Sequence, residues 1–130
     1  MDRNFFEECV DASANGAMKF PAIVAKLTNA GVESYHVDMV RGENRYYLSS
    51  GESHVVTNKI PPAPAAEKFS AAEVEAAVRS SQAGAINYPQ FMQQIAAAGT
   101  VYYITYIKGK KVIYFGRNGD AHTEYFPGSR

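Results

Sequence analysis

The sequence predicts a two-layer α+β fold in which a unit of two helices and a three-stranded meander occurs twice, the copies being related by pseudo-twofold symmetry. Shifting the chain along itself by 68 positions aligns residues 2–57 with residues 70–125 without a gap, and Gly, Pro and Tyr residues coincide along the alignment. Within each copy, helical spacing of apolar residues gives way to the alternation typical of strands. We therefore interpret residues 1–130 as one domain built by internal duplication.

The first helix of each copy is indicated by apolar residues at helical spacing. Phe6 and Val10 show this spacing in the first copy, and Val74 and Val78 repeat it at the equivalent positions of the second. Ser70, three residues ahead of a glutamate, gives a capping-box pattern at the start of the second-copy helix. Each of these helices is therefore expected to present one apolar face to a core.

The second helix of each copy is bounded by proline and glycine. Pro21 and Pro89 favour the first turn, where the missing amide costs nothing, and Gly31 and Gly99 can adopt the left-handed conformation that ends a helix. From the helical and strand periodicities together, we expect the following side chains to be buried: Phe6, Val10, Ile23, Leu27, Tyr35, Val37, Tyr46, Leu48, Val78, Phe91 and Ile95.

The strands begin after Gly31, where the apolar period changes to two. Tyr35 and Val37 point to one face, while His36 and Asp38 point to the other. Four dipeptides predict the turns between strands: Arg41-Gly42, Ser50-Gly51, Gly109-Lys110 and Asn118-Gly119. Each copy therefore ends in a three-stranded meander, and the two meanders either join edge to edge or form separate sheets.

The two copies are separated by residues 58–69, a connector that contains Pro61, Pro62 and Pro64. Prolines lack amide donors and favour extended backbone, so we expect this connector to be exposed.

Composition excludes several classes of protein. Thirteen Lys and Arg residues balance thirteen Asp and Glu residues, so the chain lacks the net positive charge that draws proteins to nucleic acid. No apolar stretch reaches the ~18 residues that a membrane-spanning helix requires. The first ten residues lack the pattern of a secretory signal, and a single cysteine, Cys9, excludes an internal disulfide. We therefore expect a soluble cytoplasmic protein.

Long runs of the chain are similar to a known family. The run GVESYHVDMVRGENRYYLSSGESH and the later run INYPQFMQQIAAAGTVYYITYIKGKKVIYFG resemble the YdfO/YbcV-like family of uncharacterised bacterial proteins, which are often encoded in prophages. The resemblance implies a two-layer α+β fold and supplies no established activity, cofactor or catalytic residue. We expect no cofactor.

The strongest polar pattern is formed by His36, Asp38, Arg45, Tyr47 and His54. In the strand register that the duplicate suggests, Asp38 faces Arg45, and the other three residues form one row across three strands. Such a row is a candidate ligand-binding site. The alternative is that these are ordinary solvent-facing strand residues.

The equivalent row of the second copy is apolar. It contains Ile104, Phe115 and His122, with Tyr106 facing Ile113. One sheet face is thus expected to be polar in the first copy and apolar in the second. Such a difference is expected when one copy of a duplicated scaffold keeps a site and the other becomes a packing surface. His122 occupies the same step as the first-copy histidine, and a duplicated histidine serves either the structure or the function of the module.

Metal and nucleic-acid sites are not expected. No close-spaced metal motif such as HExxH or CxxC is present. Basic residues gather at the second-copy turns beside tyrosines, a combination found on nucleic-acid-binding surfaces, but such lysines more commonly keep a sheet soluble. They are Lys108, Lys110, Lys111 and Arg117.

Two functional hypotheses follow from these patterns. The leading one is a small non-enzymatic binding or regulatory module, associated with prophages, that binds a protein or a small ligand. The alternative is a small-molecule binder or enzyme in which His36 or His54 acts as acid and base, Asp38 orients it and Tyr47 lines the site. A concave pocket around these side chains favours the alternative.

Overall fold

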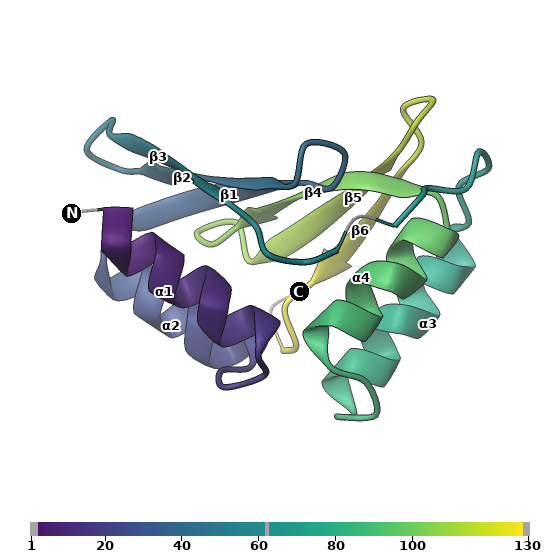
Figure 1. The fold of residues 1–130 in the computed structure, drawn as a ribbon, viewed down its shortest axis with the longest axis horizontal. Helices are drawn as coiled ribbons and strands as arrows, with labels where there is room; N and C mark the ends of the chain where they lie inside the picture. The colour runs from purple at the N-terminus through teal and green to yellow at the C-terminus, as the bar shows by residue number, and fades with distance from the viewer. Residues whose placement is uncertain (1–2, 62, 129–130) are drawn as a thin grey trace.

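The computed structural model describes residues 3–61 and 63–128 (Figure 1). Residue 2, the first of the predicted repeat, and Pro62 of the connector lie outside the described residues. The elements are α1 (Arg3–Ala14), α2 (Phe20–Asn29), β1 (Val32–Asp38), β2 (Glu43–Leu48), β3 (Ser53–Thr57), α3 (Ala71–Gln82), α4 (Tyr88–Ala97), β4 (Thr100–Tyr106), β5 (Lys111–Gly116) and β6 (Ala121–Tyr125). The order of two helices and three strands therefore occurs twice, as predicted.

The two meanders join edge to edge into one six-stranded antiparallel sheet with the strand order β3-β2-β1-β4-β5-β6. At the junction of β1 and β4, His36 lies opposite Ile104, and these two residues are equivalent in the two copies. The pseudo-twofold axis therefore passes through this central pair. All four helices cover one face of the sheet and leave the other face open (Figure 1).

The core lies between the helices and the sheet. All eleven side chains expected to be buried are buried, and Leu27 and Ile95, equivalent residues of α2 and α4, are completely enclosed. Tyrosines fill the centre, where the hydroxyl groups of Tyr88 and Tyr103 lie 2.6 Å apart. Burial raises the pKa of Tyr35 to about 12, because the phenolate loses its hydration there.

The helices begin and end near the predicted capping residues, and α4 has an additional cap at its N-terminus. Ser70 accepts a hydrogen bond from the Glu73 amide at 3.2 Å, which confirms the cap of α3. Asn87 and Gln90 form a complete capping box on α4 that the sequence analysis did not identify. Helix α2 ends just before Gly31, which adopts a positive φ of 87°. Among the described residues, no helix is long and apolar enough to cross a membrane.

The connector is less exposed than expected. In Figure 1 it crosses from the end of β3 to the start of α3. Asn58 is buried and donates to Asn44, and both Ile60 and Phe69 pack against the core. The prediction of an exposed connector was therefore wrong for these residues, because the side chains that flank the prolines reach the core: Ile60 precedes Pro61 and Phe69 follows Pro64.

The turns lie where the dipeptides predict them, but they are longer than two residues. Residues 39–42 join β1 to β2, so that Asp38 lies opposite Glu43. Residues 49–52 join β2 to β3, and the hydrogen bond from the Leu48 amide to the Glu52 carbonyl leaves a three-residue loop, 49–51, with Gly51 at a positive φ of 97°. Side chains alternate between the two faces of a strand. The four-residue turn therefore leaves the side chains of β2 on their predicted face but gives them different partners on β1. The three-residue turn shifts β3 by one residue, so each side chain of β3 lies on the face opposite to the predicted one.

Candidate functional site

The sheet face opposite the helices, called the open face below, runs across both copies. Its central row crosses all six strands and consists, in spatial order, of Val55, Arg45, His36, Ile104, Ile113 and Thr123. Neighbouring rows carry Tyr47 and Tyr106 on one side and Asp38, Tyr102 and Phe115 on the other. The open face therefore holds four of the five predicted site residues.

His36 and its neighbours differ from the predicted pairing. His36 lies directly opposite Arg45, and its ring centroid is 4.9 Å from that of Tyr47 on the same face. Asp38 lies opposite Glu43 rather than opposite Arg45, because the first turn contains four residues. The predicted pairings of Asp38 with Arg45 and of His36 with Tyr47 were therefore wrong, although His36 and Tyr47 share one face and their rings are in contact.

His54 does not belong to this group. It lies opposite Tyr46 on the helix-covered face, where its ring stacks on Phe6 of α1 at 4.8 Å. Its Nε2 atom is 3.6 Å from a carboxylate oxygen of Glu52. The predicted row of His36, Tyr47 and His54 was therefore wrong, because the three-residue turn exchanges the faces of β3.

The same exchange occurs in the second copy. His122 lies opposite Tyr114 rather than Phe115, and it faces the helices. Tyr106 lies opposite Lys111 rather than Ile113. Both histidines thus occupy equivalent places on the helix-covered side of the sheet.

The Asp38 carboxylate is used by the first turn. Its Oδ1 atom accepts hydrogen bonds from the backbone amides of Val40 and Arg41, both at 3.0 Å. The Arg41 side chain in turn contacts Glu43 at 3.0 Å. Asp38 therefore shapes the turn between β1 and β2 and leaves His36 without the orienting carboxylate that the enzyme hypothesis assigned to it.

Arg45 has a donor without a partner. Its Nε atom is buried and makes no hydrogen bond to any described residue. A buried donor left unpaired is unfavourable, and a guanidinium group keeps its charge at all physiological pH values. Burial and the positive charge of Arg45 lower the pKa of His36, so this imidazole is neutral at pH 7. The first-copy part of the open face thus combines the Arg45 guanidinium and the rings of His36 and Tyr47 with the carboxylates of Asp38 and Glu43.

The second-copy part of the open face is mainly apolar but also carries Lys111 and Thr123, and His122 of the predicted row faces the helices instead. Ile104 pairs with Ile113, and the rings of Tyr102 and Phe115 lie 5.7 Å apart. Tyr102 is 43% exposed and Tyr125 is 46% exposed, among the highest values for large hydrophobic side chains in the described part of the chain. Aromatic surface is therefore in contact with solvent next to the polar half.

Two pockets lie away from this group. One, of about 210 Å³, lies between the connector and the first turn and is lined by Met39, Ile60 and Met92. The other, of about 600 Å³, lies between α3 and the end of β6. Neither pocket is lined by His36, Arg45 or Tyr47.

Comparison with protein families identifies the family of the chain. The model of a family described as a protein of unknown function, DUF1398, matches residues 7–124 and so covers nearly all of both copies. No curated protein matches the sequence.

Proposed function

We propose that this chain, which belongs to the DUF1398 family of proteins of unknown function, is a small non-enzymatic binding module whose open face docks a protein partner. The observation that carries the proposal is the buried, unpaired Nε of Arg45 beside solvent-exposed aromatic side chains on a sheet face that no described helix covers. A regulatory role, a cytoplasmic location and an association with prophages remain predictions from the sequence and its resemblance.

The apolar half of the open face has the composition of an interface. Interfaces are enriched in tyrosine, phenylalanine and arginine, and the residues that contribute most to affinity are drawn from these types. Tyr102 on β4 and Tyr125 on β6 are exposed, and the half-buried Phe115 lies on β5 between these strands. Ile104 and Ile113 lie between them in the central row. An apolar segment of a partner would remove this surface from water.

The polar half sets the chemistry of the partner. Arg45 Nε lacks an acceptor among the described residues, and a planar guanidinium binds a carboxylate through two parallel hydrogen bonds. His36 lies opposite Arg45 on β1, and its ring is 4.9 Å from that of Tyr47. The expected partner surface therefore presents an aspartate or glutamate to Arg45 and apolar side chains to the second-copy strands.

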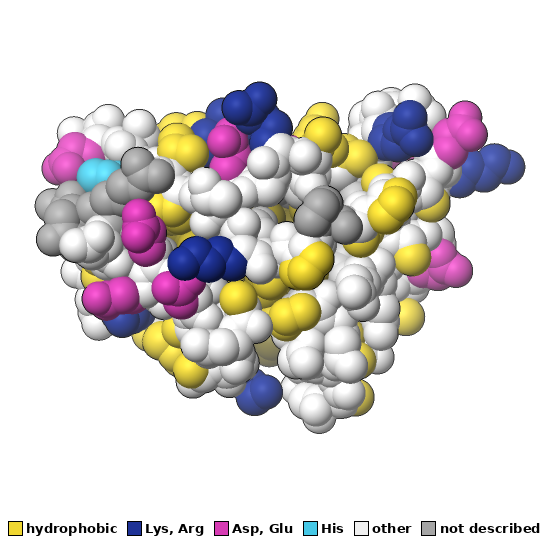
Figure 2. Space-filling model, in the orientation of Figure 1, with side chains coloured by type: hydrophobic (Ala, Val, Ile, Leu, Met, Phe, Trp, Pro, Cys, Tyr) yellow, Lys and Arg dark blue, Asp and Glu magenta, His cyan; other side chains and the backbone are white. Residues whose placement is uncertain are grey.

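The geometry favours a protein over the other ligand classes considered. Small molecules bind in concave sites, and the two described pockets are not lined by the residues of this group. A nucleic acid would meet the acidic end of the molecule, where α1 carries three acidic residues and Figure 2 shows acidic side chains gathered. Acid-base catalysis lacks support because the Asp38 carboxylate accepts hydrogen bonds from the turn amides and His54 lies on the opposite, helix-covered face of the sheet.

Site-specific cross-linking in cells tests this proposal. A photoreactive phenylalanine derivative replaces Tyr125 on the open face in one protein and Phe20 on the helix side in another. Both native side chains are aromatic and similarly exposed, at 46% and 41%. We expect a discrete protein adduct from position 125 and none from position 20.

Once the cross-linked partner is identified and purified, its affinity for this protein is measured by titration. We expect Arg45→Glu to weaken binding of the partner at least ~10-fold, since the new carboxylate at position 45 would face the carboxylate of the partner. Lys19→Glu, an equal charge reversal at the exposed start of α2, should leave the dissociation constant unchanged. Binding that is insensitive to Arg45→Glu, or adducts only from position 20, would show that the open face is not the binding surface.

A further inference from the structure

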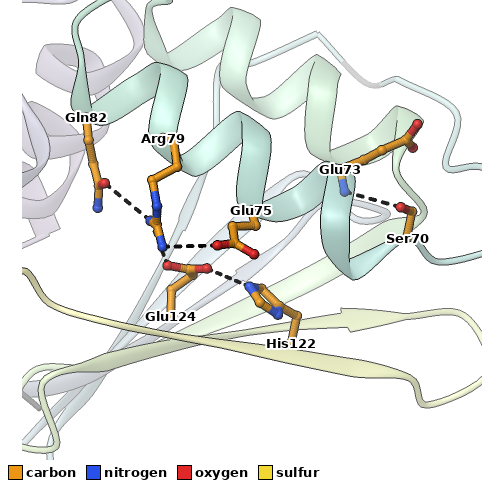
Figure 3. A network of polar contacts seen from close by, with 7 residues as sticks. All are labelled: Ser70, Glu73, Glu75, Arg79, Gln82, His122 and Glu124. Carbon is orange, nitrogen blue, oxygen red and sulfur yellow. Dashed lines mark hydrogen bonds and ion pairs between the residues drawn. The ribbon is translucent and has the colours of Figure 1, made fainter.

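A histidine and two glutamates meet beside α3, away from the open face (Figure 3). Glu75 lies on α3, whereas His122 and Glu124 lie on the helix-facing side of β6. One nitrogen or oxygen atom of each side chain lies within 4.8 Å of those of the other two. His122 Nε2 and Glu124 Oε2 are only 2.6 Å apart. Three potential metal ligands from two elements therefore converge.

Arg79 orients the two carboxylates. Its guanidinium lies 2.9 Å from Glu124 Oε1 and 3.5 Å from Glu75 Oε1. The second carboxylate oxygen of Glu124, Oε2, faces His122. Arg79 thus fixes one side of this carboxylate and leaves the opposite side directed at the imidazole, as the outer partners of metal ligands do.

The first copy shows what the fold alone requires at this place. His54 is equivalent to His122, but Val56 stands where the second copy has Glu124. Val56 is fully buried in the core, and Glu124 is nearly as buried. An apolar side chain therefore satisfies the packing at this position, while a carboxylate carries a desolvation cost. The charge of Glu124 therefore serves its polar contacts with Arg79 and His122 rather than the packing of the core.

The cluster is open to solvent on one side. The pocket of about 600 Å³ between α3 and the end of β6 is lined by Glu75, His122 and Glu124 together with Tyr125 and Phe126. A hydrated ion can enter through it, and water can complete the coordination, as in zinc sites with three protein ligands.

We propose that Glu75, His122 and Glu124 bind a divalent transition-metal ion of the zinc type. One imidazole nitrogen and two carboxylate oxygens suit zinc, nickel and cobalt better than calcium or magnesium, which favour oxygen ligands alone. The ion takes the place of the proton between His122 Nε2 and Glu124 Oε2, and this proton moves to Nδ1 of the same imidazole or is released to water. No sequence motif indicates this site, because Glu75 and the two strand residues lie far apart along the chain and only the packing of α3 on β6 brings them together.

Calorimetric titration of the chelator-treated protein with zinc chloride tests the site. We expect one zinc ion per chain, and cobalt(II) at the same site should give a visible absorption band. His122→Gln should weaken zinc binding at least ~10-fold, because even the loss of an outer partner of a metal ligand has that effect. His54→Gln is the matched control, since it removes the imidazole at the equivalent position of the first copy.

Glu75→Gln keeps the test decisive if His122→Gln unfolds the protein. Glu75 is exposed and contacts only Arg79 among the ion pairs of the described residues, so its replacement should leave the thermal midpoint unchanged while weakening zinc binding at least ~10-fold. Absence of zinc binding, binding that Glu75→Gln and His122→Gln leave unchanged, or an equal loss in His54→Gln would overturn the proposal.

Discussion

Gly42 and Lys110 occupy the same position in the first turn of the two copies, and both adopt a positive φ, of 70° and 55° respectively. This left-handed conformation is free for glycine and costs other residues about 1–2 kcal/mol. A Cβ atom at Gly42 would meet nothing within 4 Å, so the backbone alone decides the effect. The second copy therefore stores strain that the first copy avoids.

We expect Lys110→Gly to stabilise the protein by about 0.5–1 kcal/mol, since the relief of strain is partly offset by the backbone entropy of glycine. Gly42→Lys should destabilise it by a similar amount. Urea unfolding of the two variants measures both changes. A loss of stability in Lys110→Gly would show that the lysine side chain makes a contact that outweighs the strain.

Buried tyrosines should make stability fall at high pH. Burial raises the pKa of Tyr35 to about 12, and it raises the pKa of Tyr103 and Tyr114 further. The unfolded chain loses these protons near pH 10, whereas the folded protein keeps them. The stabilisation is therefore fully present below about pH 10 and is lost as the pH rises towards 12.

Urea unfolding across this pH window measures the loss, and ultraviolet absorbance reports phenolate formation. Tyr35→Phe is the control, because it removes one titrating group while keeping the ring, and we expect its stability to fall less steeply with pH. An equal slope for both proteins would mean that Tyr35 does not contribute to the effect.

Alternation along the strands predicted which side chains are buried, but the register depended on turns of unknown length. Tyr35 and Val37 could be assigned to the core because period-two burial needs only the local sequence. His54 could not, because one extra residue in the turn at 49–51 exchanges the faces of β3. The unpaired Nε of Arg45 had no sequence signal, since the lack of a partner depends on its surroundings in three dimensions.

At the scale of elements, the connector takes the place of a strand side chain. Leu48 ends β2 and is buried, whereas the equivalent residue at the end of β5 is Gly116. A Cβ atom added to Gly116 would lie 2.8 Å from the Phe69 Cβ atom. Phe69 of the connector thus fills the space that a leucine fills in the first copy. Sequence periodicity could not predict this exchange, because it pairs residues distant along the chain.

We expect Gly116→Ala to destabilise the protein by about 1–3 kcal/mol, the usual cost of overpacking a core. In a Phe69→Ala background the clash is removed, so the same substitution should cost clearly less. A double-mutant cycle measured by urea unfolding gives the coupling between the two positions. Additive effects would mean that Phe69 does not occupy the space above Gly116.

Helix α2 is held to the sheet by its apolar face, which the spacing of Ile23 and Leu27 predicted. Leu27 is completely buried, so Leu27→Ala should cost about 2–5 kcal/mol, the range for leucines whose cavities collapse only in part. Thermal or urea unfolding measures the change. A cost below ~1 kcal/mol would mean that the cavity closes almost completely or that the face is not required.

At the scale of the whole molecule, the pairing of β1 with β4 joins the two copies into one sheet, and α1 also contacts α4 across the helix layer. The sequence predicted two copies but left open whether their meanders join, because edge pairing between copies leaves no local pattern. Interfaces of this extent within a chain favour unfolding as one cooperative unit. We therefore propose that residues 1–130 form one domain.

Equivalent substitutions in the two copies test this cooperativity. Leu27 and Ile95 are equivalent and both completely buried, so Leu27→Ala and Ile95→Ala should each destabilise by about 2–5 kcal/mol. If the copies unfold together, scanning calorimetry shows one transition in both variants, shifted as a whole, with equal calorimetric and van't Hoff enthalpies. If they unfold independently, each substitution lowers the transition of its own copy alone, and a second transition remains at the original temperature. We expect the first result, because the backbone hydrogen bonds between β1 and β4 are lost as soon as either meander unfolds.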